Sequence, residues 1–157
     1  MVVLNKIAKE TIFSVQYDNI TLNNLSDTER LGKNIISGIT TFPTVVALTG
    51  PLGSGKTTLC KYLTHAYLNV DVSVVSPTFN ILNIYTGKDK KVYHYDLYRV
   101  NNALDLIELG IEEALQGCKL ILIEWPSMAM QYIKNTNVLF VEITTTNIAR
   151  TASVRTG

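Results

Sequence analysis

The chain contains 157 residues, 17% of them charged, and carries a formal net charge of +1. A chain of this length buries roughly two-thirds of the surface that its unfolded form exposes, so we expect residues 1–157 to form a single domain. The small net charge excludes a basic field that would attract nucleic acid by itself, so any contact with RNA should be indirect or local.

The cysteines and the N-terminal residues indicate a cytoplasmic protein. Cys60 and Cys118 lie in apolar stretches without the spacing of metal ligands, as expected for reduced thiols in a core. The first residues, MVVLNKIAKE, lack the apolar segment and cleavage site of a signal peptide. No apolar run approaches the roughly 18 residues of a membrane span, so we expect a soluble protein with no membrane partner.

The first predicted elements are a strand and a helix. Residues 11–17, TIFSVQY, favour a strand. Residues 25–39 predict a helix that covers a sheet, with Ser26, Asp27 or Thr28 as its N-cap. The apolar residues of this helix recur at helical spacing and are Leu31, Ile35, Ile36 and Ile39.

A buried strand and a second helix should follow. Residues 43–50, PTVVALTG, are nearly all apolar, which is typical of a parallel strand covered on both faces. A glycine-rich turn then leads into a helix over residues 56–68. Residues 80–100 predict two strands around the polar turn 86–90, and therefore a hairpin.

The last third of the chain continues the alternation of predicted helices and strands. It predicts a helix over residues 102–116, an apolar strand over 119–124, and two strands within 137–156 around the turn 145–148. Together the elements predict an α/β fold with a mixed, mostly parallel central sheet flanked by helices.

Residues 48–59, LTGPLGSGKTTL, contain the phosphate-binding pattern of a P-loop NTPase. Glycines there let the backbone approach phosphate oxygens, and the following helix N-terminus points at the anion. Lys56 would face the β and γ phosphates, and Thr57 is placed to ligate Mg²⁺. The alternative is a glycine turn whose lysine is merely solvated. The predicted nucleotide-binding residues of the loop are Gly53, Ser54, Gly55, Lys56, Thr57 and Thr58.

Two acidic residues follow predicted strands. Glu124 ends an apolar strand, at the carboxyl edge where such sheets bind ligands, so it could hold magnesium opposite Thr57. The alternative is a surface acid at a strand end. Asp96 could bind metal through water, orient the attacking water, or cap a turn. With Lys56, these carboxylates are the predicted catalytic residues.

Residues 75–80, VSPTFN, predict a loop that could close over the γ-phosphate. Ser76 and Thr78 flank a proline and would sense the loss of that phosphate, although an ordinary Ser/Thr turn has the same pattern. For Arg99 the alternatives are a contact with phosphate and an ion pair with a carboxylate such as Glu108, and we expect the pair. His94 is expected to be a core or edge histidine.

The segments GPLGSGKTT, SPTFNI, HYDLYR, LDLIELGIEEAL and LILIEWP, in this order, resemble the bacterial TsaE (YjeE) family. This family is the ATPase component of the machinery that makes threonylcarbamoyladenosine at position 37 of tRNA. The resemblance implies that Thr57 and Glu124 ligate magnesium, that Asp96 and Trp125 serve function, and that Thr28 lies near the adenine. It also implies the partners TsaD and TsaB, with tRNA reached only through their complex.

One position departs from the family pattern. The family usually has an acidic residue after the first glycine of the loop, whereas this chain has Pro51. Proline removes a backbone N–H and fixes φ. Phosphate binding should survive, but a role of that acid in hydrolysis or docking is in doubt.

Two other functions share the P-loop. A small-molecule kinase needs positive charge at the transferring phosphoryl and usually an arginine-bearing lid, and the chain has no insertion of that size. A nucleotide-dependent interaction module with little catalysis of its own overlaps with the TsaE function.

Overall fold

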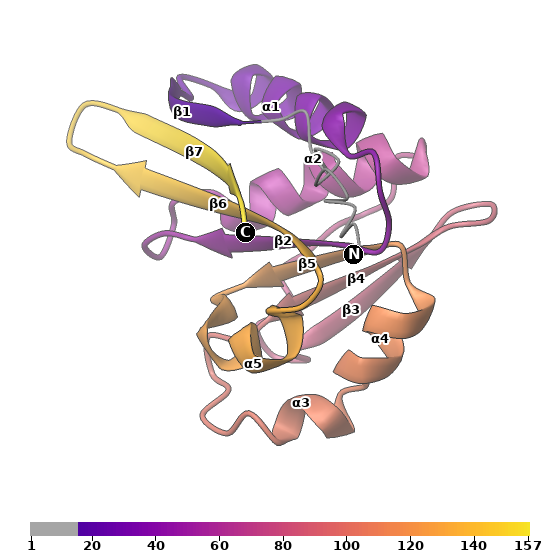
Figure 1. Cartoon of the computed structure of the whole chain (residues 1–157). Helices are drawn as coiled ribbons and strands as arrows, with labels where there is room; N and C mark the ends of the chain where they lie inside the picture. Colours follow the sequence, from indigo (N-terminus) through magenta and orange to yellow (C-terminus); the bar gives the residue numbers. More distant parts are fainter. Residues whose placement is uncertain (1–15) are drawn as a thin grey trace, which may run out of the picture.

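A seven-stranded mixed sheet forms the centre of the computed structural model, which describes residues 16–157 (Figure 1). The strand order is β1-β7-β6-β2-β5-β4-β3. The four central strands β6, β2, β5 and β4 are parallel to one another, while β7, β1 and β3 pair antiparallel with their neighbours. The predicted mixed sheet is confirmed. The strands are β1 (Tyr17–Thr21), β2 (Thr44–Thr49), β3 (Leu82–Thr86), β4 (Lys91–Asp96), β5 (Leu120–Glu124), β6 (Asn137–Thr145) and β7 (Arg150–Thr156).

Helices cover both faces of the sheet. Figure 1 shows α1 and α2 on one face and α3, α4 and α5 on the other. None of the helices within residues 16–157 has the length and apolar character needed to cross a membrane. The helices are α1 (Leu25–Gly38), α2 (Lys56–Leu68), α3 (Asp105–Glu108), α4 (Ile111–Gly117), the short 3₁₀ helix η1 (Pro126–Ala129) and α5 (Met130–Ile133).

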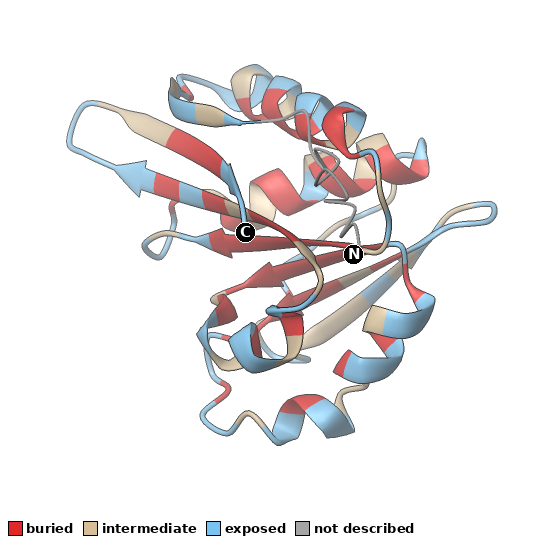
Figure 2. Ribbon diagram, in the orientation of Figure 1, coloured by how far each residue is buried: buried red, intermediate tan, exposed pale blue. Residues whose placement is uncertain are grey.

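The central strands separate two apolar cores. Along β2, Val46 and Leu48 join the core beneath α1 and α2, whereas Val45 and Ala47 join the core beneath the other helices. Figure 2 shows that β2 and β5 are buried along almost their whole length, as expected for strands covered on both faces. Cys60 and Cys118 are free and buried, which confirms the prediction of core thiols.

Most predicted elements lie where the sequence placed them. The helix over residues 56–68 and both hairpins are confirmed. The strand predicted over residues 11–17 falls mostly outside the described residues, and β1 begins at Tyr17.

The N-cap of α1 differs from the prediction. It is Asn24 rather than Ser26, Asp27 or Thr28, because its Oδ1 accepts the N–H of Asp27 at 3.0 Å. The Asp27 carboxylate in turn accepts the N–H of Asn23 at 3.0 Å. This reciprocal pair resembles a capping box displaced by one residue.

The helix predicted over residues 102–116 is two helices. The helix is interrupted at Gly110, which has a φ of 71° and is the N-cap of α4. A residue in the left-handed conformation cannot continue α3. The helical spacing of the apolar residues therefore continues across a position where the helix itself stops.

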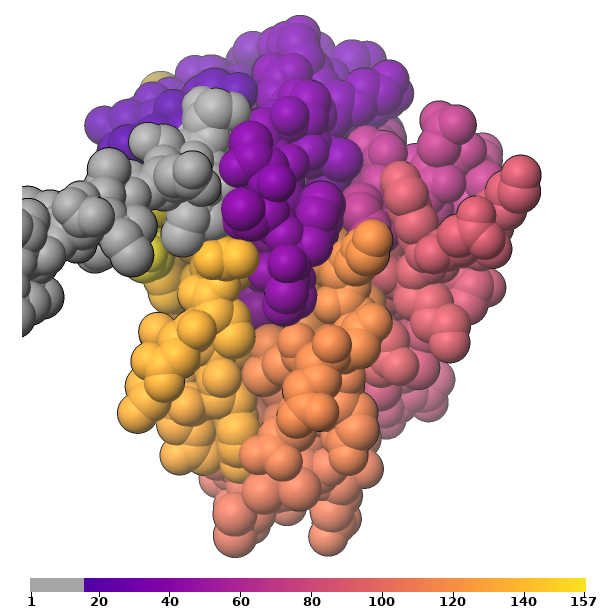
Figure 3. Space-filling model, turned by 45° about the vertical axis from the view of Figure 1, so that its right-hand side comes forward, coloured from indigo at the N-terminus to yellow at the C-terminus, as the bar shows by residue number. Residues whose placement is uncertain are grey.

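The parallel strands place the glycine loop and two carboxylates at one edge of the sheet. The loop 50–55 leaves β2 there, and β4 and β5 end at Asp96 and Glu124, which are register partners. Figure 3 shows the opposite edge, where residues near 40 lie between those near 120 and those near 137. Hydrogen bonds from Thr44 N–H to Lys119 O and from Asn137 Nδ2 to Pro43 O fix that edge.

Gly32 lies at a close contact between α1 and α2, because a Cβ atom built there would lie 2.9 Å from Cβ of Tyr62. We predict that Gly32→Ala lowers the free energy of unfolding by about 1–3 kcal/mol through overpacking. Gly117→Ala is the control, since no atom lies within 4 Å of its Cβ position. Urea denaturation would measure both variants, and a Gly32→Ala protein as stable as the parent would contradict the close packing.

Candidate functional site

The loop between β2 and α2 is built from glycines with positive φ. Gly50, Gly53 and Gly55 have φ angles of 146°, 73° and 103°. A Cβ atom at Gly50 would lie 2.4 Å from the carbonyl oxygen of Ile143, so the position needs glycine for space as well as conformation. Gly55 is the N-cap of α2, whose first N–H groups have no partner within the helix and form an anion-binding terminus.

A cavity of about 330 Å³ lies beside this loop. Every predicted site residue lines it except Thr28 and Ser54. Three residues outside the predicted site, Leu52, Tyr98 and Arg99, line it as well. The complete lining is Leu52, Gly53, Gly55, Lys56, Thr57, Thr58, Ser76, Thr78, Asp96, Tyr98, Arg99, Glu124 and Trp125.

The two predicted residues outside the cavity are buried elsewhere. Thr28 on α1 is 2% exposed, and its hydroxyl donates to the carbonyl oxygen of Asn24 at 3.4 Å. Ser54 is fully buried, and its hydroxyl has no hydrogen-bond partner within residues 16–157. The side chains of both residues therefore stay away from the cavity, and their assigned contacts remain predictions.

The Lys56 ammonium is bound by its own loop. Nζ donates to the carbonyl oxygens of Gly50 and Pro51, both at 2.9 Å, and lies 4.2 Å from the ring centroid of Trp125. Burial lowers the pKa of Lys56, while the carboxylates of Glu124 and Asp96 act in the opposite direction. Pro51, the departure from the family pattern, thus contributes a carbonyl where it cannot contribute an N–H.

The Glu124 carboxylate joins three elements. Its Oε1 accepts the hydroxyl of Thr57 at 2.8 Å, so the predicted pair of the P-loop threonine and the strand-end acid is in contact. The same oxygen lies 2.9 Å from Nε2 of His94 on β4, and Glu124 is 3% exposed. This contact of His94 was not predicted from the sequence. Its position two residues before Asp96 was the available signal, because alternate residues of a strand share a face.

Asp96 holds the loop that contains Ser76 and Thr78. Its Oδ2 accepts the hydroxyls of Ser76 at 3.1 Å and Thr78 at 2.6 Å, and its Oδ1 accepts the N–H of Tyr98 at 3.1 Å. The turn-capping alternative for Asp96 is therefore observed. A role toward metal or water stays a prediction, and so does a switch role for the loop.

Aromatic side chains surround the mouth of the cavity. Trp125 has a φ of 59°, and its backbone N–H donates to the carbonyl oxygen of Leu48 at 3.1 Å. Tyr98 lies against it, with ring centroids 5.1 Å apart. Arg99 lies 4.9 Å from the ring centroid of Phe79, and no ion pair joins it to Glu108 in the described part of the chain. The predicted Arg99 pair is wrong, because the stacked guanidinium turns toward the cavity rim.

A comparison with known families identifies the chain. The model of the family described as "Threonylcarbamoyl adenosine biosynthesis protein TsaE" matches residues 22–153. The chain belongs to the TsaE family. This membership confirms the resemblance drawn from the loop, the HYDLYR segment and the IEWP segment.

Several relatives named "tRNA threonylcarbamoyladenosine biosynthesis protein TsaE" are similar to this TsaE family member. The protein of Rickettsia conorii is 42% identical over 105 residues, 67% of this chain and 59% of that relative. The protein of Nostoc sp. is 37% identical over 134 residues, 82% of this chain and 81% of the relative. The chain thus spans about three-fifths of the length of the Rickettsia relative.

The fold is also similar to a solved structure. The crystal structure of Bacillus subtilis YdiB superposes with a TM-score of 0.68 and 24% sequence identity, covering 91% of this chain and 88% of that one. At this identity the likeness shows the fold alone, and it agrees with the α/β fold predicted from the sequence.

The contact between Asp96 and Thr78 generates a prediction about the loop 75–80. Thr78→Val keeps the side-chain shape but removes a hydrogen bond to a carboxylate, which contributes about 1.5–3 kcal/mol. We expect backbone amides of this loop to exchange hydrogen about 10-fold faster or more, as measured by mass spectrometry.

Thr136→Val provides the control for the loop experiment. Its hydroxyl donates to Ile133 O at 2.7 Å, far from this loop. Equal exchange of the loop in the Thr78→Val and Thr136→Val proteins would show that Asp96 does not hold it.

Proposed function

We propose that this protein binds ATP with Mg²⁺ and hydrolyses it, as the ATPase component of the machinery that makes threonylcarbamoyladenosine at position 37 of tRNA. The observation that carries the proposal is the contact of Thr57 with Glu124 beside a glycine loop at the carboxyl edge of the sheet. Family membership supplies the pathway. The pathway also suggests the cytoplasm as the compartment, and the single continuous sheet supports one domain over residues 1–157 as a further part of the proposal.

The residues present fit magnesium and a nucleoside triphosphate. The Thr57 hydroxyl and the Glu124 carboxylate offer the oxygen ligands that Mg²⁺ prefers. Gly53 has open space around its Cβ position, so phosphate can approach the backbone there. Bound magnesium would neutralise charge on the β and γ phosphates.

The residues predicted to bind the nucleotide then have proposed roles. Lys56 would leave the carbonyls of Gly50 and Pro51 for the phosphate oxygens. Backbone N–H groups of residues 53–58, including buried Ser54 and cavity-lining Thr58, would bind the phosphates. Thr28 would act on the adenine side by placing α1, since its own side chain is buried.

Hydrolysis also needs a positioned water. Asp96 is the proposed residue for that task, because it lies at the cavity edge in register with Glu124. Its carboxylate is engaged by Ser76 and Thr78, so their release would couple the loop 75–80 to the state of the phosphates. Trp125, which contacts Lys56, would transmit the same change at the cavity mouth.

Replacement of Glu124 tests the site. Glu124→Gln keeps the shape but removes the charge, so we expect ATP hydrolysis to fall by roughly 10²-fold or more. The free energy of unfolding should change by less than about 2 kcal/mol, because the amide oxygen can still accept hydrogen bonds. Glu142→Gln, on the exposed side of β6, is the control. Hydrolysis at the parental rate in the Glu124→Gln protein would reduce Glu124 to a structural acid.

The resemblance to the TsaE family suggests the partners TsaD and TsaB, and the chemistry of the site suggests what a partner could supply. Phosphoryl transfer is catalysed mainly by positioning and positive charge, and an arginine supplied from outside can accelerate a P-loop NTPase by roughly 10³ to 10⁵ fold. Of the described arginines, only Arg99 lines the cavity, where it is stacked on Phe79, while Arg150 lies against the loop with Nη1 3.4 Å from the Cβ position of Gly55. We therefore propose slow hydrolysis by the protein alone and faster hydrolysis in complex with both partners.

This coupling is measurable in two ways. ATP turnover should rise when the matching TsaD and TsaB subunits are added, and ATP should tighten binding to them relative to ADP, because coupling is reciprocal at equilibrium. Fast turnover of the protein alone, together with equal partner affinity in ATP and ADP, would contradict the proposal. Transfer of phosphate to a nucleoside in the same assay would favour the kinase alternative.

A further inference from the structure

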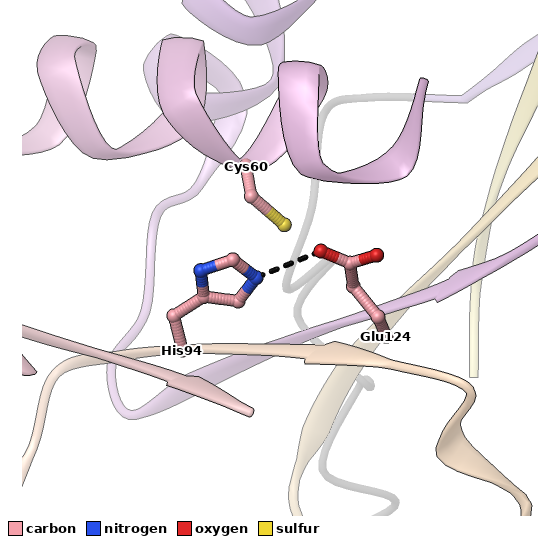
Figure 4. Close-up of side chains that lie close together, drawn as sticks. All are labelled: Cys60, His94 and Glu124. Atoms are coloured by element: carbon pink, nitrogen blue, oxygen red, sulfur yellow. Dashed lines mark hydrogen bonds and ion pairs between the residues drawn. The ribbon is translucent and has the colours of Figure 1, made fainter. Parts of the chain in front are cut away.

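Three chemically different side chains meet beneath the P-loop. Cys60 comes from α2, His94 from β4 and Glu124 from β5, and all three are buried. One ligand atom from each lies within 4.8 Å of the other two. Figure 4 shows the Cys60 sulfur and the facing atoms of His94 and Glu124 directed toward a common point.

The chemistry of this cluster differs from that of a magnesium site. Mg²⁺ prefers oxygen ligands, whereas a thiolate, an imidazole and a carboxylate together are a typical set for zinc. We propose that Cys60, His94 and Glu124 form a binding site for a zinc-class divalent ion, distinct from the Thr57 and Glu124 pair. Occupation of this site would remove Glu124 from the magnesium position.

The geometry needs only small side-chain movements. Zinc bonds of about 2.0–2.3 Å to nitrogen, oxygen and sulfur place tetrahedral ligands roughly 3.3–3.7 Å apart. The Nε2 of His94 and the Oε1 of Glu124 are 2.9 Å apart and would open slightly, while the sulfur would move closer. The thiol proton leaves to solvent as the metal–sulfur bond forms, the proton that Nε2 of His94 shares with Glu124 moves to Nδ1 so that Nε2 is free to bind, and no atom changes oxidation state. Glu124 lines the cavity, which provides an entry path.

No motif in the sequence predicts this site. Cys60 is 34 residues from His94 and 64 from Glu124 (94 − 60 and 124 − 60), so neither has the short spacing of familiar zinc motifs. The fold joins them because β4 and β5 are neighbours and α2 packs across both strands. Cys60 follows Thr57 by three residues on the same helix, so both side chains face the one carboxylate.

The consequence for ATP rests on the proposed function. Oε1 of Glu124 accepts the hydroxyl of Thr57 at 2.8 Å and faces His94 at 2.9 Å. An ion held by His94 and Cys60 would take this oxygen as its third protein ligand. Zinc should therefore weaken magnesium-dependent ATP binding, and Mg-ATP should weaken zinc binding by the same factor.

The test uses Co²⁺ as a spectroscopic substitute for zinc on the full chain without nucleotide. Thiolate ligation to Co²⁺ produces a near-ultraviolet charge-transfer band, which does not depend on ATPase activity. Because the chain has only two cysteines and two histidines, a matched set of variants covers all of them. The site variants are Cys60→Ala, Cys60→Ser and His94→Gln, and the controls are Cys118→Ala and His65→Gln.

We expect the parent and both controls to show the band at one equivalent of Co²⁺, with zinc displacing it. Both Cys60 variants should lack the band, and His94→Gln should bind at least about 10-fold more weakly. Circular dichroism confirms folding, and Cys60→Ser preserves side-chain size where alanine leaves a cavity. Absence of the band in the parent, or its persistence in a folded Cys60 variant, would overturn the proposal.

A second measurement separates this site from the proposed function. Zinc should lower Mg-ATP affinity at least about 10-fold in the parent and not in Cys60→Ala, whose P-loop is unchanged. An intact Co²⁺ band with no effect of zinc on ATP would support the metal site and contradict the proposed role of Glu124 toward magnesium.

Discussion

The position of β5 between β2 and β4 determines where the site forms. Backbone pairing places Glu124 beside Leu48 on one side and beside Asp96 on the other. Parallel strands in this register end together, so the loop after β2 and both strand-end carboxylates occupy one edge. The apolar residues that precede Glu124 are fully buried on both faces of β5, so a one-residue shift would move each of them into the opposite core and would turn Glu124 away from Thr57 and His94.

Local sequence patterns were sufficient to predict those parts of the site whose residues are contiguous in the chain. The buried strand, the glycine loop and the helix from Lys56 to Leu68 are contiguous, and Glu124 is marked by the apolar run before it. Contacts between distant residues were not predictable in the same way. The approach of His94 and Cys60 to Glu124 depends on strand order, and the break at Gly110 depends on a backbone angle that apolar spacing does not encode.

The polar groups of the cavity are bound to one another. Lys56 donates to loop carbonyls, Thr57 to Glu124, and Ser76 and Thr78 to Asp96. Lys56 and Glu124 are buried and already have partners, so a bound anion or cation would compete with these existing hydrogen bonds. In the proposed function, ligand binding would therefore exchange hydrogen bonds, and the loop 75–80 would take part through Ser76 and Thr78.

The existing contacts of the Lys56 ammonium have a consequence for which anions the loop can bind. Two carbonyls and the Trp125 ring already surround the charge, so an anion gains only the difference between its own contacts and these. A single inorganic phosphate offers few oxygens for that exchange, whereas the phosphate chain of the proposed nucleoside triphosphate would reach the ammonium and the N-terminus of α2 together. Free phosphate in the cell would therefore compete poorly for this loop.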